Sequence, residues 1–234
     1  MASPQGEIPR GLRETAFVLY AGIFRGPCRR QTPLMRSEMT LERPEQYRFH
    51  NGTKAVVPFA PEEYEARLEG LRDIMELHGL DAIVLTSMHN VAYYSGFLYC
   101  SFGRPYGCVV TATECVTISA GIDAGQPWRR SHGDNITYTD WKRDNFWRAV
   151  ASVTGTGKAV GCEADHLTME RAEKFNAFVQ PKRGLDIAPA TMVQRMTKSA
   201  AEIALIKAGA NVADVGGYAI KEAVKAGVRE IDVA

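Results

Sequence analysis

The sequence has few of the features that mark secreted, membrane-bound or zinc-binding proteins. It holds five cysteines among 234 residues, an odd number, and no two of them form a Cys-x-x-Cys pair. A disulfide framework and a zinc site are therefore not predicted. No apolar run approaches the roughly 18 residues that a membrane-spanning helix needs. These absences favour a protein of a reducing compartment, the cytoplasm, without a membrane partner.

The chain also lacks an excess of charge of either sign. Its 28 lysines and arginines face 27 aspartates and glutamates, so we expect no nucleic acid partner. The 45% hydrophobic and 24% charged fractions are those of an ordinary globular protein.

Motifs of the common nucleotide-binding and hydrolytic sites are missing as well. Gly-x-Ser-x-Gly, the P-loop pattern, Gly-x-Gly-x-x-Gly and His-Glu-x-x-His do not occur, and no cofactor is predicted. Residues 163–166, Glu-Ala-Asp-His, combine acids with a histidine. They fit a metal site, but a strand-to-helix loop uses the same residues as helix caps, and we favour that interpretation.

The first part of the chain differs in composition from the rest. Residues 1–36 carry six arginines, no lysine and two acids, around an apolar patch at 15–24. A signal peptide, a mitochondrial presequence and an upstream extension with the true start at Met35 or Met39 all fit parts of this pattern. We expect residues 1–46 to be an unstructured or spurious extension.

The middle of the chain alternates helix and strand patterns. Tyr64, Leu68, Leu71 and Met75 recur at helical spacing between Pro61 and Gly79. Branched, apolar runs predict strands at 80–86, 107–111, 115–119, 135–139, 158–163 and 185–187, with further helices at 144–153 and 167–179. The pattern predicts an α/β domain over residues 47–195, with a mixed sheet of five or six strands and flanking helices.

A different pattern begins at Ser199. Ser199 and Glu202 fit a capping box, and Ile203, Ile206, Ala210 and Ala213 share one face of a helix that we expect to stop at Gly227. A helix with an apolar face needs a surface to pack on. Residues 196–234 are therefore predicted to be a linker and the first helix of an incomplete C-terminal domain.

Two stretches rich in aromatic and basic residues are the candidate sites. Arg104 stands between Gly103 and Pro105, where rigid neighbours suit the capture of a carboxylate, although a solvated loop arginine is also possible. Trp128 beside Arg129 and Trp141 beside Lys142 predict cation–π stacks. We favour a protein interface made by the second set, which comprises Trp128, Arg129, Arg130 and Trp141.

These stretches carry a resemblance to a known family. The runs Ser-Gly-Phe-Leu-Tyr-Cys-Ser-Phe-Gly-Arg-Pro-Tyr (95–106) and Gly-Gln-Pro-Trp-Arg-Arg (125–130) resemble the creatinases (creatine amidinohydrolases) of the pita-bread family. That family also contains prolidase and aminopeptidase P, and shares the Lys-Ser-x-x-Glu start of the last helix. The resemblance covers residues 50–234. Ala92, Gly121 and Ala124 depart from it, and the N-terminal extension has no counterpart.

The resemblance implies a fold and an activity. It implies a creatinase/prolidase N-terminal domain followed by the first helix of a truncated pita-bread catalytic domain. The family reaction is hydrolysis of creatine to sarcosine and urea, without a metal or other cofactor, by a homodimer. The family's catalytic histidine and glutamates lie beyond Ala234, so no catalytic residue is assigned here and the chain alone is expected to be inactive.

The same resemblance implies a role for two residues and leaves one alternative. Phe102 and Arg104 match the residues that, in the family, close the active site of the other subunit. There Arg104 is expected to bind the creatine carboxylate. The alternative is a non-catalytic binding or dimerisation module of the Xaa-Pro peptidase-like branch.

Overall fold

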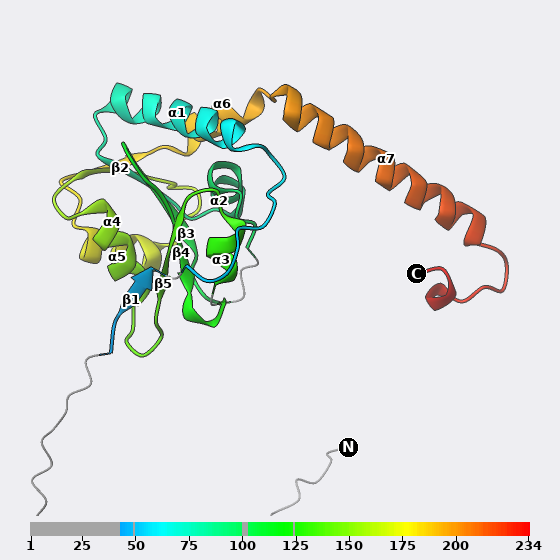
Figure 1. The fold of residues 1–234 in the computed structure, drawn as a ribbon, viewed down its shortest axis with the longest axis horizontal. Coiled ribbons are helices and arrows are strands. Elements are labelled where there is room, and N and C mark those ends of the chain that lie inside the picture. Colours follow the sequence, from blue (N-terminus) through cyan, green and yellow to red (C-terminus); the bar gives the residue numbers. More distant parts are fainter. Residues whose placement is uncertain (1–42, 49, 100–102, 124) are drawn as a thin grey trace, which may run out of the picture. The chain divides into compact units, whose positions relative to one another are not determined.

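The computed structural model describes residues 43–48, 50–99, 103–123 and 125–234 (Figure 1). Seven strands of this part form one mixed sheet in the order β1-β5-β4-β3-β2-β6-β7. They are β1 (Gln46–Arg48), β2 (Ala82–Leu85), β3 (Gly107–Thr111), β4 (Cys115–Ala120), β5 (Asp134–Tyr138), β6 (Ala159–Cys162) and β7 (Arg183–Asp186). The α/β class is confirmed, with one strand more than the five or six expected.

The additional strand is β1, at one edge of the sheet. It pairs antiparallel with β5, Tyr47 opposite Thr137. The β2–β3 and β3–β4 pairs are also antiparallel, whereas β2–β6, β4–β5 and β6–β7 are parallel. Three residues with alternating polarity carry too little pattern to predict a strand, and β1 forms by pairing with the edge of β5.

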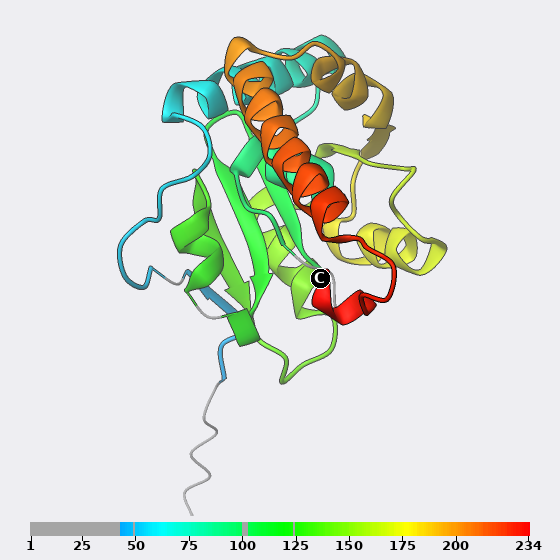
Figure 2. The ribbon, with the colours of Figure 1, turned by 90° about the vertical axis from the view of Figure 1, so that its right-hand side faces the viewer.

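Helices cover both faces of the sheet, as Figure 2 shows. Helices α1 (Pro61–His78), α2 (Met88–Ser95) and α3 (Gln126–Arg130) lie on one side, and α4 (Asn145–Thr154) and α5 (Met169–Val179) on the other. The alternation of β4 fits this arrangement, because the Cys115 thiol approaches the carbonyl of Tyr94 in α2. The next residue along β4, Val116, points to the opposite face and is fully buried.

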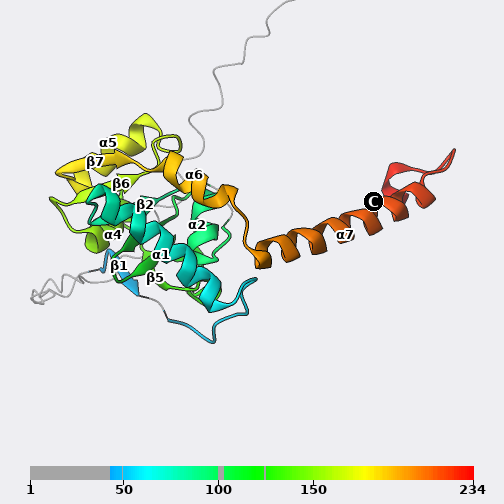
Figure 3. The ribbon, with the colours of Figure 1, turned by 90° about the horizontal axis from the view of Figure 1, so that it is seen from above.

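Helix α1 has the ends and the buried stripe that its sequence predicts. Pro61 occupies the first turn, where its missing N–H costs no hydrogen bond, and Gly79 closes the helix with a left-handed backbone (φ 58°). The four stripe residues are all buried, together with Arg67. Helix α1 lies beside α6 (Ala188–Met196), as the view in Figure 3 shows.

The sequence did not reveal α2, α3 and α6. Helix α2 begins where the Ser87 hydroxyl accepts a hydrogen bond from the backbone N–H of Asn90, and it ends at Gly96 (φ 76°). Its eight residues include two tyrosines and a valine, which favour strands, so the pattern contained no helical stripe. Helices α3 and α6 each begin with a proline in the first turn and are likewise short.

Helix α7 (Ala200–Ala223) confirms the capping box. The Ser199 hydroxyl accepts from the N–H of Glu202, and the Glu202 carboxylate accepts from the N–H of Ser199. The helix ends at Ala223, before Gly227, and none of its residues is buried. A short 3₁₀ helix, η2 (Glu230–Asp232), follows. Within the described residues no helix has the length and apolar character to cross a membrane.

Candidate functional site

Arg104 lies in the loop that leads into β3. Gly103 before it has a left-handed backbone (φ 75°) with no atom near the position of a Cβ, so glycine is needed there for its backbone conformation alone. Pro105 after it restricts the backbone of Arg104. The Tyr138 hydroxyl donates to the Pro105 carbonyl over 3.0 Å, and burial raises the pKa of that tyrosine. The loop is thereby tied to the end of β5.

Aromatic residues that flank the same loop in the sequence pack against one another. The rings of Tyr99 and Tyr106 stack with their centroids 4.7 Å apart, and Phe97 lies 6.2 Å from Tyr106. The Tyr99 hydroxyl donates to the Thr86 carbonyl over 2.7 Å. Burial raises the pKa of Tyr99 to about 12, opposed by Arg171. These two tyrosines are buried and part of the core.

The guanidinium of Arg104 borders a cavity of about 340 Å³. The cavity walls come from the 103–105 loop, the end of β5 and the first turns of α4 and α5. Five cationic and three acidic side chains line it: Arg104, Lys142, Arg143, Arg171 and Lys174, with Asp140, Asp144 and Glu170. The excess of cations suits an anionic group of a ligand.

Two acids act on Arg104 within this region. Its Nη1 forms an ion pair with Oδ1 of Asp140. The side chain of Arg104 is 41% exposed to solvent and that of Asp140 is 44% exposed. Asp123 is the second acid: burial raises the pKa of its carboxyl, and the positive charge of Arg104 opposes that rise. Sequence reasoning missed Asp140 as a partner, because no local pattern joins it to Arg104.

Phe102, the other residue predicted to contact substrate, lies outside the described residues.

The predicted interface residues divide between two places. Trp128 lies under the Lys54 ammonium, 4.7 Å from the ring centroid, and beside the His50 ring. The cation that stacks on the Trp128 ring is therefore Lys54. The predicted cation–π stack of Trp128 with Arg129 is wrong, because the Arg129 guanidinium donates to the Asn51 carbonyl over 3.1 Å. Arg130, at the end of α3, is exposed.

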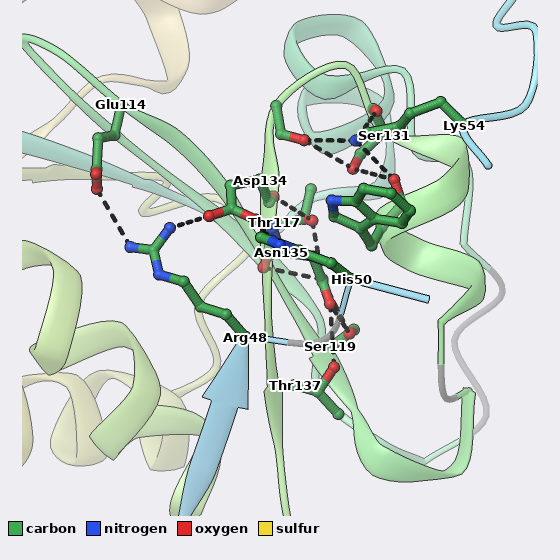
Figure 4. A network of polar contacts seen from close by, with 12 residues as sticks. Arg48, His50, Lys54, Glu114, Thr117, Ser119, Ser131, Asp134, Asn135 and Thr137 are labelled. Atoms are coloured by element: carbon green, nitrogen blue, oxygen red, sulfur yellow. Dashed lines mark hydrogen bonds and ion pairs between the residues drawn. The ribbon is translucent and has the colours of Figure 1, made fainter. Parts of the chain in front are cut away.

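Lys54 fastens the 50–55 segment to the end of α3. Its ammonium donates to the carbonyls of Trp128, Ser131 and Gly133 over 2.7–2.8 Å (Figure 4). Burial lowers the pKa of Lys54, and the carboxylate of Asp134 opposes that effect. Three carbonyls and a ring satisfy this ammonium within its own chain, so its contacts are those of a structural residue.

Asp134 joins β1 to β5 in the same region. It accepts from Arg48 and, over 2.6 Å, from His50, while Arg48 also reaches Glu114 (Figure 4). Burial raises its pKa, but hydrogen bonds from His50, the Asn135 N–H and Arg48 outweigh it, and the pKa is lowered overall. Behind it, the fully buried side chains of Thr117, Ser119, Asn135 and Thr137 bond to one another.

Trp141 is tied to the start of the described chain. Its indole N–H donates to the Pro44 carbonyl over 2.7 Å, and Lys142 lies 5.9 Å from its ring centroid. This confirms the predicted Trp141–Lys142 contact. Trp141 remains 45% exposed, and a role at an interface stays a prediction for Trp128, Arg129, Arg130 and Trp141.

The acid and histidine cluster at 163–166 serves the fold. Glu163 is 2% exposed and accepts from the N–H groups of Thr86 and Ser87, the Ser87 hydroxyl and the Asn90 amide. His166 bonds to the Thr86 hydroxyl over 2.9 Å. Glu163 thus joins the end of β6 to the start of α2. The favoured cap interpretation is wrong for the helix that follows this loop, because the Thr168 hydroxyl caps α5. Among the described residues, no three acid, histidine or cysteine side chains form a group that could hold a metal ion.

Comparison with known proteins identifies the domain. The profile described as "Creatinase/Prolidase N-terminal domain" matches residues 67–197. The chain belongs to this family. It is 48% identical, over 189 residues, to a creatinase of Bacillus sp. (strain B-0618), an alignment that covers 79% of the chain and 46% of that enzyme. It is also 26% identical to an uncharacterized hydrolase/peptidase of Sinorhizobium fredii, over 75% of the chain and 48% of the relative.

The solved structures show the same fold. The prolidase of Pyrococcus horikoshii OT3 superposes with a TM-score of 0.57 at 20% identity, over 72% of this chain and 46% of that one. A dipeptidase of Mycobacterium ulcerans superposes with a TM-score of 0.55 at 23% identity, over 75% and 48%. The chain therefore spans about half the length of the curated relatives it matches.

Proposed function

We propose that this creatinase/prolidase-type domain serves a creatinase-like hydrolase, which converts creatine and water into sarcosine and urea without a metal. In this proposal Phe102 and Arg104 close the active site of the other subunit of a homodimer. The catalytic histidine and glutamates that the family resemblance implies belong to a separate domain.

The observation that carries this proposal is the presentation of Arg104. Arg104 lines a cation-rich cavity, on a loop held by Tyr138 and by the Gly103 and Pro105 backbone. Such a group binds a planar carboxylate through two parallel hydrogen bonds. Creatine carries one carboxylate, so a single fixed arginine suits it, and the 48% identity to a Bacillus creatinase supports the same substrate.

The test uses a joined enzyme, in which this chain replaces the matching N-terminal part of the Bacillus creatinase. We expect the joined enzyme to release urea from creatine. The 234-residue chain by itself is the negative control. A folded joined enzyme that releases no urea would instead favour the alternative, a non-catalytic binding or dimerisation module of the Xaa-Pro peptidase-like branch.

Arg104→Ala is then expected to raise the KM for creatine about tenfold to a hundredfold, because a charge-assisted and bidentate contact contributes roughly 1.5–3 kcal/mol. Arg104→Lys recovers only part of the loss, since an ammonium cannot reproduce the planar fork. Steady-state urea release gives both values. An unchanged KM in Arg104→Ala would remove Arg104 from the site.

A heterodimer shows whether Arg104 acts on its own subunit or on its partner. One subunit carries Arg104→Ala, and the other lacks the catalytic histidine. If Arg104 acts across the interface, one site loses both groups and the other keeps both, so about half of the activity per dimer survives. If Arg104 acts within its own subunit, each site has one defect and the activity falls close to zero.

A further inference from the structure

The ion pair between Arg104 and Asp140 has its shortest contact at one end of the guanidinium. That contact joins Nη1 to one carboxylate oxygen, Oδ1. Neither Nε nor Nη2 has a hydrogen-bond acceptor among the residues that the structure describes. An arginine held in this way keeps the Nε–Nη2 edge free, and that edge can still donate two parallel hydrogen bonds to a second carboxylate.

Asp140 itself is fixed by the residues on either side of it. The N–H of Thr139 donates to the Glu45 carbonyl over 2.9 Å, and its carbonyl accepts from the Asn145 amide over 2.8 Å. On the other side, the Trp141 indole donates to the Pro44 carbonyl. Asp140 is therefore held on a short, anchored connection and not on a free loop.

The same end of β5 holds both the backbone and the side chain of the Arg104 loop. Tyr138 binds the carbonyl of Pro105, and Asp140, two residues later, binds the guanidinium of Arg104. Two anchors on one short segment fix the position of the arginine and also its direction. An arginine that is already oriented loses less side-chain entropy when a ligand binds.

From this geometry we infer that Asp140 is a positioning residue, which orients Arg104 so that its Nε–Nη2 edge faces the substrate carboxylate. This role rests on the proposed function. It concerns substrate affinity and not the chemical step, because Asp140 acts through Arg104.

The joined enzyme tests the inference. Asp140→Ala frees the guanidinium and is expected to raise the KM for creatine about threefold to tenfold, with kcat unchanged, from the rotamer freedom that Arg104 regains. Asp140→Asn should stay within about twofold of the wild type, since its amide oxygen still accepts from Nη1. In an Arg104→Ala background, Asp140→Ala should have no further effect on KM.

The matched control is Glu173→Ala. Glu173 is an exposed acid of α5 that does not line the cavity, so its removal changes the net charge equally without releasing Arg104 and should leave the KM unchanged. A lower KM in both Asp140 variants would mean that Asp140 competes with the substrate, and it would overturn the inference. An unchanged KM in Asp140→Ala, with normal turnover, would overturn it too.

A second measurement needs no catalysis. In the 234-residue chain labelled with ¹⁵N-arginine, slow rotation of the Arg104 guanidinium should give separate Nη signals that merge in Asp140→Ala. Identical spectra of the two proteins would contradict the inference. A folded joined enzyme that does not hydrolyse creatine would overturn the proposed function and with it this role, so the two failures are distinguishable.

Discussion

Glu163 offers the sharpest test of how this domain is held together. Its buried carboxylate accepts four hydrogen bonds, from two backbone N–H groups, a hydroxyl and an amide, at 2.5–2.8 Å. The donors belong to Thr86, Ser87 and Asn90, at the end of β2 and the start of α2. Asn90 also reaches the Thr191 hydroxyl over 3.1 Å, so one carboxylate connects β2, α2, β6 and α6.

Glu163→Gln removes the charge and one acceptor while keeping the shape. The remaining amide oxygen serves two of the four donors. The new NH₂ group then faces the Ser87 hydroxyl, which can turn to accept, and the Asn90 amide, which accepts only if it flips and gives up its bond to Thr191. One buried donor left unsatisfied costs roughly 1–3 kcal/mol, and the retained bonds lose their charge assistance, so we expect a loss of about 2–4 kcal/mol.

Urea denaturation of the 234-residue chain measures this loss. With a slope of about 2 kcal/mol/M, the midpoint should fall by about 1–2 M at an unchanged slope. Glu163→Ala should cost more, since all four donors lose their acceptor. Asp165→Asn is the control, an exposed acid of the same loop, with a change below about 0.5 kcal/mol. A Glu163→Gln midpoint equal to that of the control would refute the reasoning.

Two further predictions concern charged groups of the fold. Arg67 is 4% exposed, and its guanidinium lies 4.2 Å from the ring centroid of Phe59 and 4.3 Å from that of Tyr93. It also forms an ion pair with Glu202 of α7 at 3.3 Å. Arg67→Met should therefore speed amide hydrogen exchange in the first turn of α7, and unchanged exchange there would argue against this link. The lowered pKa of Asp134 means that its contribution to stability is complete above about pH 4 and is lost as the pH falls through the folded-state pKa. Thermal melts should show the wild type losing its advantage over Asp134→Asn below pH 4, and a constant difference would contradict the assignment.

The elements predicted from the sequence are those whose pattern is local. Helix α4 was expected at 144–153 and lies at Asn145–Thr154, because Phe146, Ala149 and Val150 give its apolar face a helical period and all three are buried. Helix α2 has no such period, and its ends depend on Ser87 and on Gly96. The predicted stripe of α1 contained Tyr64 but not Arg67, since a charged residue is an improbable core residue until its aromatic neighbours are known.

The candidate site shows the same division between local and distant information. Arg104 could be singled out, because Gly103 and Pro105 stand directly beside it and constrain it. Lys54 could not, because the carbonyls that bind it belong to Trp128, Ser131 and Gly133, far along the chain. The sequence thus indicates which side chains are presented, whereas their partners depend on how the strands are ordered.

Strand order also explains why the partner of Arg104 is Asp140. Strands β4 and β5 are parallel, with Ala120 opposite Tyr138, so both end at the same edge of the sheet. Strand β3 runs antiparallel to β4, and its first residue, Gly107, lies opposite Ile118 near that edge. The loop before β3 and the connections after β4 and β5 therefore meet there, which brings Arg104 to Asp140 and within the electrostatic range of Asp123. The pairing is therefore a consequence of topology, because the strand order brings the connections that carry Arg104 and Asp140 to the same end of the sheet.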